Sequence, residues 1–258
     1  MSDFTGRLAL VTGAASGIGA ASARLLAERG ARVACADRDL PGARVVADGI
    51  VRDGHAATAL LLDVADETAW DIAMESLRHQ QGGLHVLVHC AGISAASPLV
   101  DTTLAEWRRV LAVNLDGGFL AVRAGVRAMQ ANGGAIVLVG SASGVRPPVG
   151  AAAYATSKGA LAVLARAAAK ECRQANLAIR INVVSPAGVK TPMWRSMPFF
   201  QDLVREHGSE EAAFAALAGP GERFIDPTEV ARAVVFLASD AAARVTGAEL
   251  PVDDGYLI

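Results

Sequence analysis

Short apolar runs alternate along the chain with longer segments in which apolar residues recur at helical spacing. Most of the short runs are apolar at consecutive positions, as in parallel strands that are covered by helices on both faces. The pattern therefore predicts an α/β fold with a doubly wound, seven-stranded parallel sheet in three αβα layers, formed by one domain of residues 1–258. We place its strands at 7–12, 32–37, 57–63, 84–90, 135–141, 178–184 and 248–252.

In the segments between these strands, apolar residues recur at the spacing of a helix. Asp66, and Asp226 followed by Pro227, have the residue types that begin helices. Residues 193–222 fit no strand position, and we expect them to form a lid over a substrate site. The expected helices are 17–30, 41–53, 66–81, 103–131, 151–175 and 227–239.

Composition narrows the classes of partner. Apolar residues make up 52% of the chain, and 24 basic against 26 acidic residues give a net charge of −2. No basic surplus points to nucleic acid or an anionic membrane, and no apolar run approaches the length of a membrane span. The three widely separated cysteines predict neither disulfides nor a metal cluster, and the five histidines show no metal-ligand spacing. We expect a cytoplasmic protein without a metal.

A glycine-rich turn joins the first strand directly to the first helix. Backbone can approach a pyrophosphate closely in such a turn, and the free N–H groups and the positive end of the helix dipole favour its charge. The context of strand, turn and helix makes this signal stronger than glycines alone. The predicted cofactor contacts here are Gly13, Ser16, Gly17, Ile18 and Gly19.

Two aspartates end the next two predicted strands. Asp37 lies eighteen residues beyond Gly19, where a carboxylate can bind the adenosine ribose hydroxyls. A 2′-phosphate there would meet like charge, which favours NAD over NADP, although the adjacent Arg38 could offset part of that repulsion. Asp63, followed by Val64, would lie beside the adenine ring or act only as a turn residue before a helix.

Candidate catalytic side chains follow the fifth strand. Tyr154 and Lys158 are spaced by four, which places them on one face of a helix. A nearby ammonium and a positive nicotinamide would favour the phenolate and lower the pKa of the tyrosine, so that it could act as a base. Ser141, thirteen residues before Tyr154, could hold a carbonyl or alcohol oxygen against the phenol, and Ser143 competes for this role.

Asn114 interrupts a helical pattern in the segment 103–131. An amide at this position can leave a backbone carbonyl free to bind a water molecule. The alternative is an ordinary helix-ending asparagine before Gly117 and Gly118.

These motifs, in this order, resemble the compact branch of the short-chain dehydrogenase/reductase family over nearly the whole chain. The resemblance implies a Rossmann-type domain, a pyrophosphate bound at the turn Thr12–Gly19 and a homo-oligomer, often a tetramer. It also implies that Val189 and Thr191 touch the nicotinamide carboxamide, in a segment with Pro186. The implied catalytic tetrad is Asn114, Ser141, Tyr154 and Lys158, with Asn114 holding a relay water.

The chain departs from the family pattern near the cofactor. The usual Asn-Asn-Ala-Gly after the fourth strand is His89-Cys90-Ala91-Gly92, and Pro-Gly has become Pro186-Ala187-Gly188. We still expect Cys90, Ala91 and Gly92 to contact the cofactor. These changes bear on cofactor affinity and loop shape more than on the type of reaction.

The sequence thus predicts an NAD-dependent oxidoreductase that interconverts a secondary alcohol and a ketone. The alternatives are an NADP-dependent ketone reductase and an NAD-binding sensor or scaffold without turnover. Met193 and Trp194 are predicted to contact the substrate with Ser141, Ser143 and Tyr154. The aromatic lid residues fit a ring-bearing substrate or mere packing, whereas Arg195, Arg205 and His207 could bind an anionic group.

Overall fold

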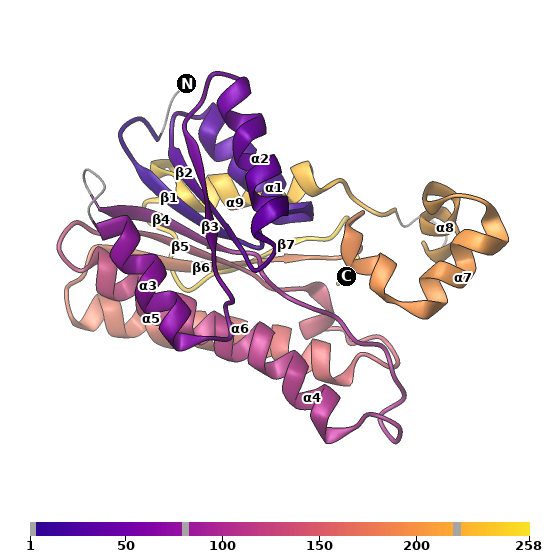
Figure 1. Ribbon diagram of the computed structural model, residues 1–258. Helices are drawn as coiled ribbons and strands as arrows, with labels where there is room; N and C mark the ends of the chain where they lie inside the picture. Colours follow the sequence, from indigo (N-terminus) through magenta and orange to yellow (C-terminus); the bar gives the residue numbers. More distant parts are fainter. Residues whose placement is uncertain (1–3, 79–82, 219–222) are drawn as a thin grey trace.

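A single parallel sheet organises the protein. The computed structural model describes residues 4–78, 83–218 and 223–258. The strand order β3-β2-β1-β4-β5-β6-β7 reverses direction between β1 and β4, which confirms the predicted doubly wound sheet (Figure 1). The strands are β1 (Leu8–Thr12), β2 (Arg32–Asp37), β3 (Ala57–Leu61), β4 (Leu84–His89), β5 (Gly134–Val139), β6 (Ile179–Pro186) and β7 (Glu249–Val252).

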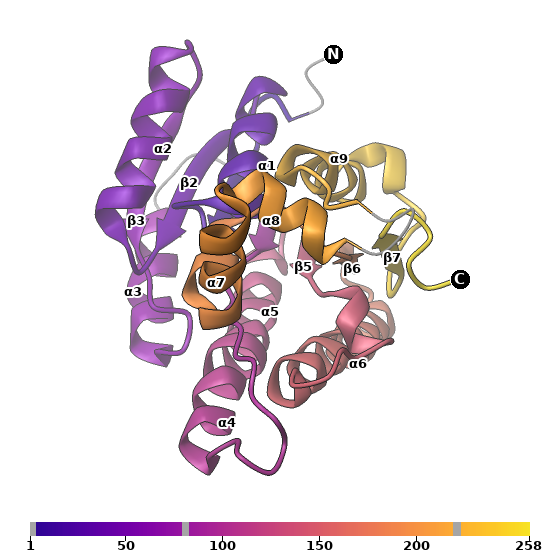
Figure 2. The same ribbon diagram turned by 90° about the vertical axis from the view of Figure 1, so that its right-hand side faces the viewer.

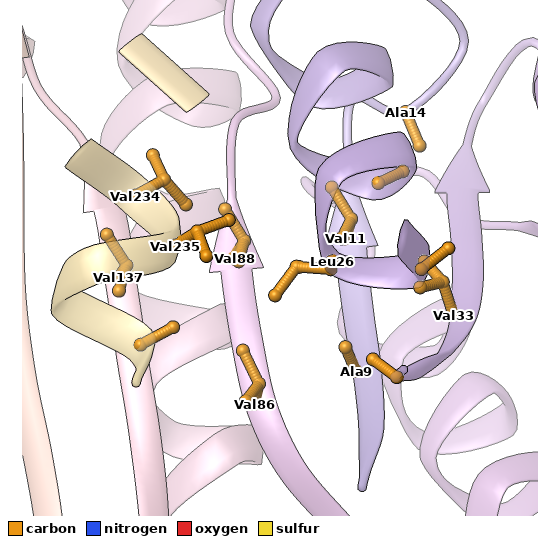
Figure 3. Packing of buried hydrophobic residues seen from close by; sticks show 14 of the residues in the cluster. Ala9, Val11, Ala14, Leu26, Val33, Val86, Val88, Val137, Val234 and Val235 are labelled. Carbon is orange, nitrogen blue, oxygen red and sulfur yellow. The ribbon is translucent and has the colours of Figure 1, made fainter. Parts of the chain in front are cut away.

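One face of the sheet is covered by α1 (Gly17–Glu28), α2 (Leu40–Arg52) and α9 (Pro227–Ala238). The core on this face consists largely of valine and alanine, which allows the helices to lie close to the strands (Figure 3). α9 begins at Asp226 and Pro227 as the sequence predicts, and a capping box forms there, since the Asp226 side chain caps the helix and Glu229 bonds back to the Asp226 N–H.

The opposite face is covered by α3 (Glu67–Arg78), α5 (Gly117–Met129) and α6 (Ala152–Gln174). Its core is richer in leucine and isoleucine, and the fully buried Trp70 donates its indole N–H to the carbonyl of Val64 at 3.0 Å. Both faces of the central strands are therefore buried, as their unbroken apolar runs predict. None of the described helices combines the length and apolar character needed to cross a membrane.

The predicted helix 103–131 is divided in the structure. It begins with α4 (Leu104–Leu111), widens into a π-helical turn (Ala112–Asp116) and continues as α5. Asn114 lies inside the π turn, so it interrupts the helix without ending it before Gly117. In the π turn the side-chain amide of Asn114 is directed into the protein, where it makes three hydrogen bonds.

Several strands end earlier than their apolar patterns suggest. β3 ends at Leu61, β4 at His89 and β5 at Val139, so that Asp63, Cys90 and Ser141 lie in the loops that follow. Local side-chain bonds explain two of these ends: the Asp63 carboxylate accepts the N–H of Ala65, and the Ser141 hydroxyl accepts that of Ser143. Of the predicted helix 66–81, residues 79–81 lie outside the described residues.

The expected lid segment is largely helical in its described part. It contains a 3-10 helix (Pro192–Ser196), α7 (Pro198–His207) and α8 (Glu210–Leu217), while residues 219–222 of the predicted range 193–222 lie outside the described residues. The two helices project beyond the carboxyl ends of the strands (Figure 1). They have a small core of their own, formed by Met197, Phe200, Ala213 and Phe214.

Candidate active site

One cavity of about 980 Å³ opens at the carboxyl ends of the strands, between the sheet and the lid segment. Loops that follow β1, β2, β4, β5 and β6 contribute to its wall, together with α6 and the lid. Ligands of doubly wound sheets bind at this edge, beside the point where the strand order reverses. The residues that line the cavity include the end of β2 and the lid segment. One cavity can therefore combine a nucleotide end near β2 with a substrate end under the lid.

The glycine turn after β1 is tightly folded. Gly13 has φ +67°, and a Cβ on it would lie 2.8 Å from the backbone nitrogen of Ala91. A Cβ on Gly19 would lie 2.1 Å from the carbonyl oxygen of Gly13, so neither position has room for a side chain. Ser16 is the N-cap of α1 and its side chain makes no capping bond, which leaves first-turn N–H groups available to an anion.

Asp37 is held rigidly at the nucleotide end. Its carboxylate accepts the N–H of Ala15 at 3.0 Å and that of Asp39 at 2.9 Å, which ties the end of β2 to the glycine turn. Arg38, Asp63 and Val64 also line this end. The uncapped helix, the closely packed glycines and the fixed carboxylate fit a dinucleotide, whose pyrophosphate the turn would hold and whose ribose Asp37 would bind.

The loop after β4 is anchored from behind by Asn114. This side chain is fully buried: its Oδ1 accepts the N–H of Ile93 at 2.8 Å, and its Nδ2 donates to the Ile93 carbonyl at 2.9 Å and to the Ser157 hydroxyl at 3.0 Å. A Cβ on Gly92 would lie 3.3 Å from both Asn114 Oδ1 and Lys158 Nζ. The glycine therefore allows both side chains to lie close to this loop.

Ser141, Tyr154 and Lys158 lie together on the cavity wall. The Lys158 ammonium donates to the Val139 carbonyl at 2.8 Å and lies 5.8 Å from the centre of the Tyr154 ring. Burial raises the pKa of Tyr154, and a hydrogen bond with Ser141 opposes this rise. Burial lowers the pKa of Lys158 to about 8, with an opposing contribution from Cys90.

The neighbouring groups of Lys158 are neutral. Burial lowers the pKa of His89 to about 3, helped by the charge of Lys158. Burial also raises the pKa of the Cys90 thiol to about 12, so it is no nucleophile at neutral pH. His89 Nδ1 lies 3.0 Å from the Thr12 hydroxyl, which accepts the N–H of Ala91 at 3.3 Å. His89 thus connects β1 to the loop that lines the cavity.

The lid contributes an apolar wall. Trp194 packs edge-on against Phe224, with 5.1 Å between the ring centroids. Its indole N–H donates a hydrogen bond to the Val189 carbonyl at 2.9 Å. Trp194 therefore offers only apolar surface to the cavity, which Met193, Met197, Phe199 and Leu217 also line. Phe200 and Phe214 are buried inside the lid, so for them the packing interpretation holds.

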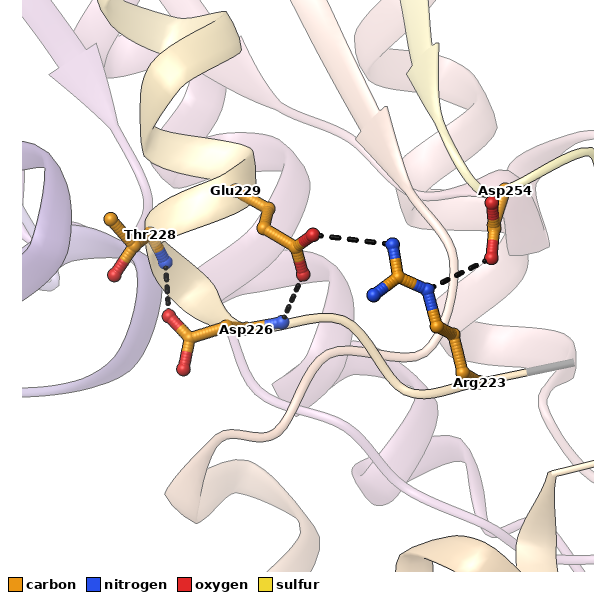
Figure 4. Close-up of polar contacts among 5 residues, drawn as sticks. All are labelled: Arg223, Asp226, Thr228, Glu229 and Asp254. Carbon is orange, nitrogen blue, oxygen red and sulfur yellow. Dashed lines mark hydrogen bonds and ion pairs between the residues drawn. The ribbon is translucent and has the colours of Figure 1, made fainter.

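The lid is tied to the body at its base. Val189 pairs with Ile225 in an isolated parallel bridge that joins the two ends of the segment. Arg223 then contacts the Asp254 carboxylate at 3.0 Å and Glu229 at 3.3 Å, and Glu229 accepts the N–H of Asp226 (Figure 4). These contacts join the lid, the start of α9 and the C-terminal segment beside the cavity.

Most of the predicted site residues line the cavity, but among the described residues Asn114 and the three lid cations do not. Asn114 is fully buried behind the cavity wall and, within the described residues, does not line the cavity. The lid cations expected to bind an anion are also elsewhere: Arg195 pairs with Glu210, Arg205 pairs with Asp202, and neither lines the cavity in the described part of the chain, nor does His207. The cavity-lining predictions are Gly13, Ser16, Gly17, Ile18, Gly19, Asp37, Arg38, Asp63, Val64, Cys90, Ala91, Gly92, Ser141, Ser143, Tyr154, Lys158, Pro186, Val189, Thr191, Met193 and Trp194.

Sequence reasoning missed some of the lining residues. Arg109 lines the cavity one helical turn before Val113, and a helical projection of α4 could have indicated this face. Tyr256 lines it from the C-terminal segment, where Arg146 stacks on its ring at 4.7 Å and donates to its carbonyl at 2.7 Å. No local signal in the sequence points to Tyr256.

Comparisons with known proteins agree with this geometry. A family model described as enoyl-(acyl carrier protein) reductase matches residues 13–257. The chain is 42% identical to cis-4-hydroxycyclohexanecarboxylate dehydrogenase of Sinomonas cyclohexanicum, over 98% of this chain and 97% of the relative. It is 38% identical to cyclopentanol dehydrogenase of Comamonas sp. (strain NCIMB 9872), over 99% of both chains.

A solved structure shares the fold over its full length. It comes from Sinorhizobium meliloti 1021, is provisionally described as a short-chain alcohol dehydrogenase, and has a TM-score of 0.86 and 36% identity over 99% of this chain and 98% of that one. The fold, the cavity and the relatives together give one conclusion. The chain belongs to the short-chain dehydrogenase/reductase family and is a nicotinamide-dependent oxidoreductase that acts on CH–OH groups.

Proposed function

We propose that the protein reversibly oxidises ring-bearing secondary alcohols to ketones, with NAD as its preferred cofactor and Tyr154 as the general base. The observation that carries this proposal is the common cavity wall of Ser141, Tyr154 and Lys158, which is continuous with the glycine turn. A bound nicotinamide supplies the acceptor or donor of the hydride.

Each catalytic side chain has a distinct task in this mechanism. Ser141 binds the substrate oxygen and orients it toward Tyr154, which removes the hydroxyl proton during oxidation and returns it during reduction. Lys158, as an ammonium, stabilises the phenolate and binds the nicotinamide ribose. Because burial raises the pKa of Tyr154 in the protein alone, its activation depends on positive charge nearby.

Asn114 positions the loop and supports the relay that the family resemblance implies. Its amide fixes both backbone groups of Ile93, and its Oδ1 and Lys158 Nζ flank Gly92. We propose that Asn114 holds a water molecule through which the proton passes from Lys158 toward solvent.

Asp37 is the basis for the preference for NAD. Two backbone N–H groups hold its carboxylate at the end of β2, facing the nucleotide end of the cavity. A 2′-phosphate at this position would meet a fixed negative charge, and the exposed Arg38 offsets only part of it.

The lid wall supports a ring-bearing substrate. Met193, Trp194 and Phe199 present apolar surface to the cavity, and the only polar atom of the indole is already bonded. A polyol would leave its hydroxyls unpaired against this wall, which costs binding energy. Two of the relatives named above are, by their names, dehydrogenases of cyclic alcohols.

We include a cytoplasmic homotetramer in the proposal on the basis of the family resemblance. The alanine-rich α6 supports an assembly because its outward face carries Val163 with 59% of its surface exposed. An apolar side chain on a face rich in small residues is suited to close helix packing between subunits.

The test is a panel of cyclic and acyclic secondary alcohols assayed with NAD⁺ and with NADP⁺, by the absorbance of the reduced nicotinamide. We expect turnover of cyclic alcohols with NAD⁺ and a preference for NAD⁺ over NADP⁺. Tyr154→Phe should lower kcat by about 10²–10⁴-fold with NAD⁺ affinity unchanged, because it removes only the acid–base group.

The contradicting outcomes are specific. NAD⁺ binding without turnover of any alcohol would favour a sensor or scaffold, and faster turnover with NADP⁺ would favour an NADP-dependent ketone reductase. A Tyr154→Phe enzyme of normal kcat would show that another group moves the proton.

A further inference from the structure

Arg109 lines the cavity from α4, a helix that carries none of the proposed catalytic or cofactor residues. It lies in the last turn of α4, and this helix packs against α6, which carries Tyr154 and Lys158. A guanidinium thereby lines the cavity from the helix that packs against the one carrying Tyr154 and Lys158.

Two of the other described cations that line the cavity are engaged. Lys158 donates to the Val139 carbonyl, and Arg223 contacts Asp254 and Glu229. Arg38 follows β2 at the nucleotide end. The guanidinium of Arg109, in contrast, has neither a hydrogen bond nor an ion pair with any described residue. A cation with five donors that faces a ligand cavity without a partner suits an anionic ligand group.

We propose that the substrate is a ring-bearing hydroxy acid whose carboxylate binds Arg109. This inference rests on the proposed function and names its substrate class. The ring would pack on the apolar wall of Met193 and Trp194, the hydroxyl would meet Ser141 and Tyr154, and the carboxylate would accept hydrogen bonds from the guanidinium. Oxidation then transfers the carbinol hydride to the nicotinamide and the hydroxyl proton to Tyr154, which gives a keto acid.

Arginine is suited to this task because its planar fork matches both oxygens of a carboxylate. The lid cations are not alternatives, since Arg195 and Arg205 form ion pairs with acidic neighbours on the lid. The relative at 42% identity is, by its name, a dehydrogenase of a hydroxycyclohexane carboxylate, whose chemistry combines the same three groups.

The test compares 4-hydroxycyclohexanecarboxylate with its methyl ester, which keeps the ring and the hydroxyl but lacks the charge. For the natural enzyme we expect kcat/KM for the acid to exceed that for the ester by about tenfold or more, the size of one charge-assisted hydrogen bond. Arg109→Gln should remove this preference by raising KM for the acid, while kcat and the values for the ester stay the same. Arg109→Lys should keep part of the preference.

Arg108 provides a matched control. It is the adjacent arginine of α4, is also exposed, and does not line the cavity in the described part of the chain. Arg108→Gln changes the net charge by the same amount and should leave the preference for the acid intact.

Three outcomes would overturn the proposal: a preference that survives Arg109→Gln, an equal loss in Arg108→Gln, or a KM for NAD⁺ that rises with both substrates. The last would assign Arg109 to a cofactor phosphate. Oxidation of other alcohols but of neither probe would reject the substrate class alone, whereas failure to oxidise any alcohol would reject the proposed function.

Discussion

The buried ammonium of Lys158 lowers the stability of the folded protein at neutral pH. The side chain is 4% exposed, and its ammonium has one described hydrogen bond, to the Val139 carbonyl. Burial lowers its pKa to about 8 from 10.5, which corresponds to a penalty on the order of 3 kcal/mol for keeping it protonated in the folded state. Functional sites commonly contain groups that are needed for activity although they lower the stability of the fold.

Lys158→Met should therefore raise the free energy of unfolding at pH 7, by on the order of 2–3 kcal/mol, while turnover is lost. The folded protein binds fewer protons than the unfolded chain between pH 8 and 10.5, so the penalty is full below about pH 8 and disappears as the pH rises toward 10.5. The advantage of the variant should shrink over this range. Denaturant unfolding at pH 7 and at pH 10 measures it.

Lys170→Met is the control, because this lysine is exposed on the same helix. It should change the unfolding free energy little at either pH. A Lys158→Met protein that is less stable than the natural one at pH 7 would show that the ammonium is stabilising in the fold.

At this scale the sequence predicts which residues meet but not their energetics. Tyr154 and Lys158 share a helical face because of their spacing of four, and the structure places Ser141 beside them. The direction of the Tyr154 pKa, upward in the protein alone, follows from burial that no local pattern reports. The pairing of His89 with Thr12 likewise depends on two strands that are far apart in the sequence.

The π turn between α4 and α5 is the element that connects the fold to the cavity. It places the fully buried side chain of Asn114 where it satisfies both the N–H and the carbonyl of Ile93. The loop that carries Cys90, Ala91 and Gly92 is thereby held against the cofactor end of the cavity.

Asn114→Ala should leave the two backbone groups of Ile93 without their partner and lower the unfolding free energy by about 1–3 kcal/mol. The freed loop should also weaken NAD⁺ binding, measured by titration of intrinsic fluorescence or by calorimetry.

Ser157→Ala is the matched variant, because it removes the third bond of Asn114 and keeps both bonds to Ile93. It also removes the bond that the Ser157 hydroxyl donates to the Tyr154 carbonyl. Its NAD⁺ affinity should stay close to that of the natural enzyme. Equal losses in the two variants would mean that anchoring of the loop does not explain the position of Asn114.

Most elements follow from the apolar pattern, and the exceptions have identifiable causes. The period of the segment 103–131 predicts one helix, but the π turn within it depends on bonds to a distant loop. The aromatic residues of the lid show neither strand nor long-helix periodicity, so the sequence pattern does not predict α7 and α8. These helices are stabilised by a core of their own. Short helices of this kind gain their stability from packing rather than from propensity.

At the scale of the whole molecule, the residues that line the candidate active site come from segments that are distant in the chain. The glycine turn, the π turn, α6 and the lid meet only because the parallel sheet brings the carboxyl ends of its strands to one edge (Figure 2). The sequence predicts the positions of these motifs along the strands, and with them the cavity. The contributions of Arg109, Arg223 and Tyr256 depend on how separate elements approach each other, and this approach is visible only in the folded chain.

The central claim is that Tyr154 and Ser141 hold the reacting oxygen beside the nicotinamide. A crystal structure with NAD⁺ and a ketone or an alcohol bound tests it most directly. We predict that the Tyr154 and Ser141 hydroxyls both lie about 2.6–3.2 Å from the substrate oxygen, with the carbinol carbon facing the nicotinamide ring. A substrate oxygen bound by other groups, with the Tyr154 ring turned away from the nicotinamide, would contradict the account.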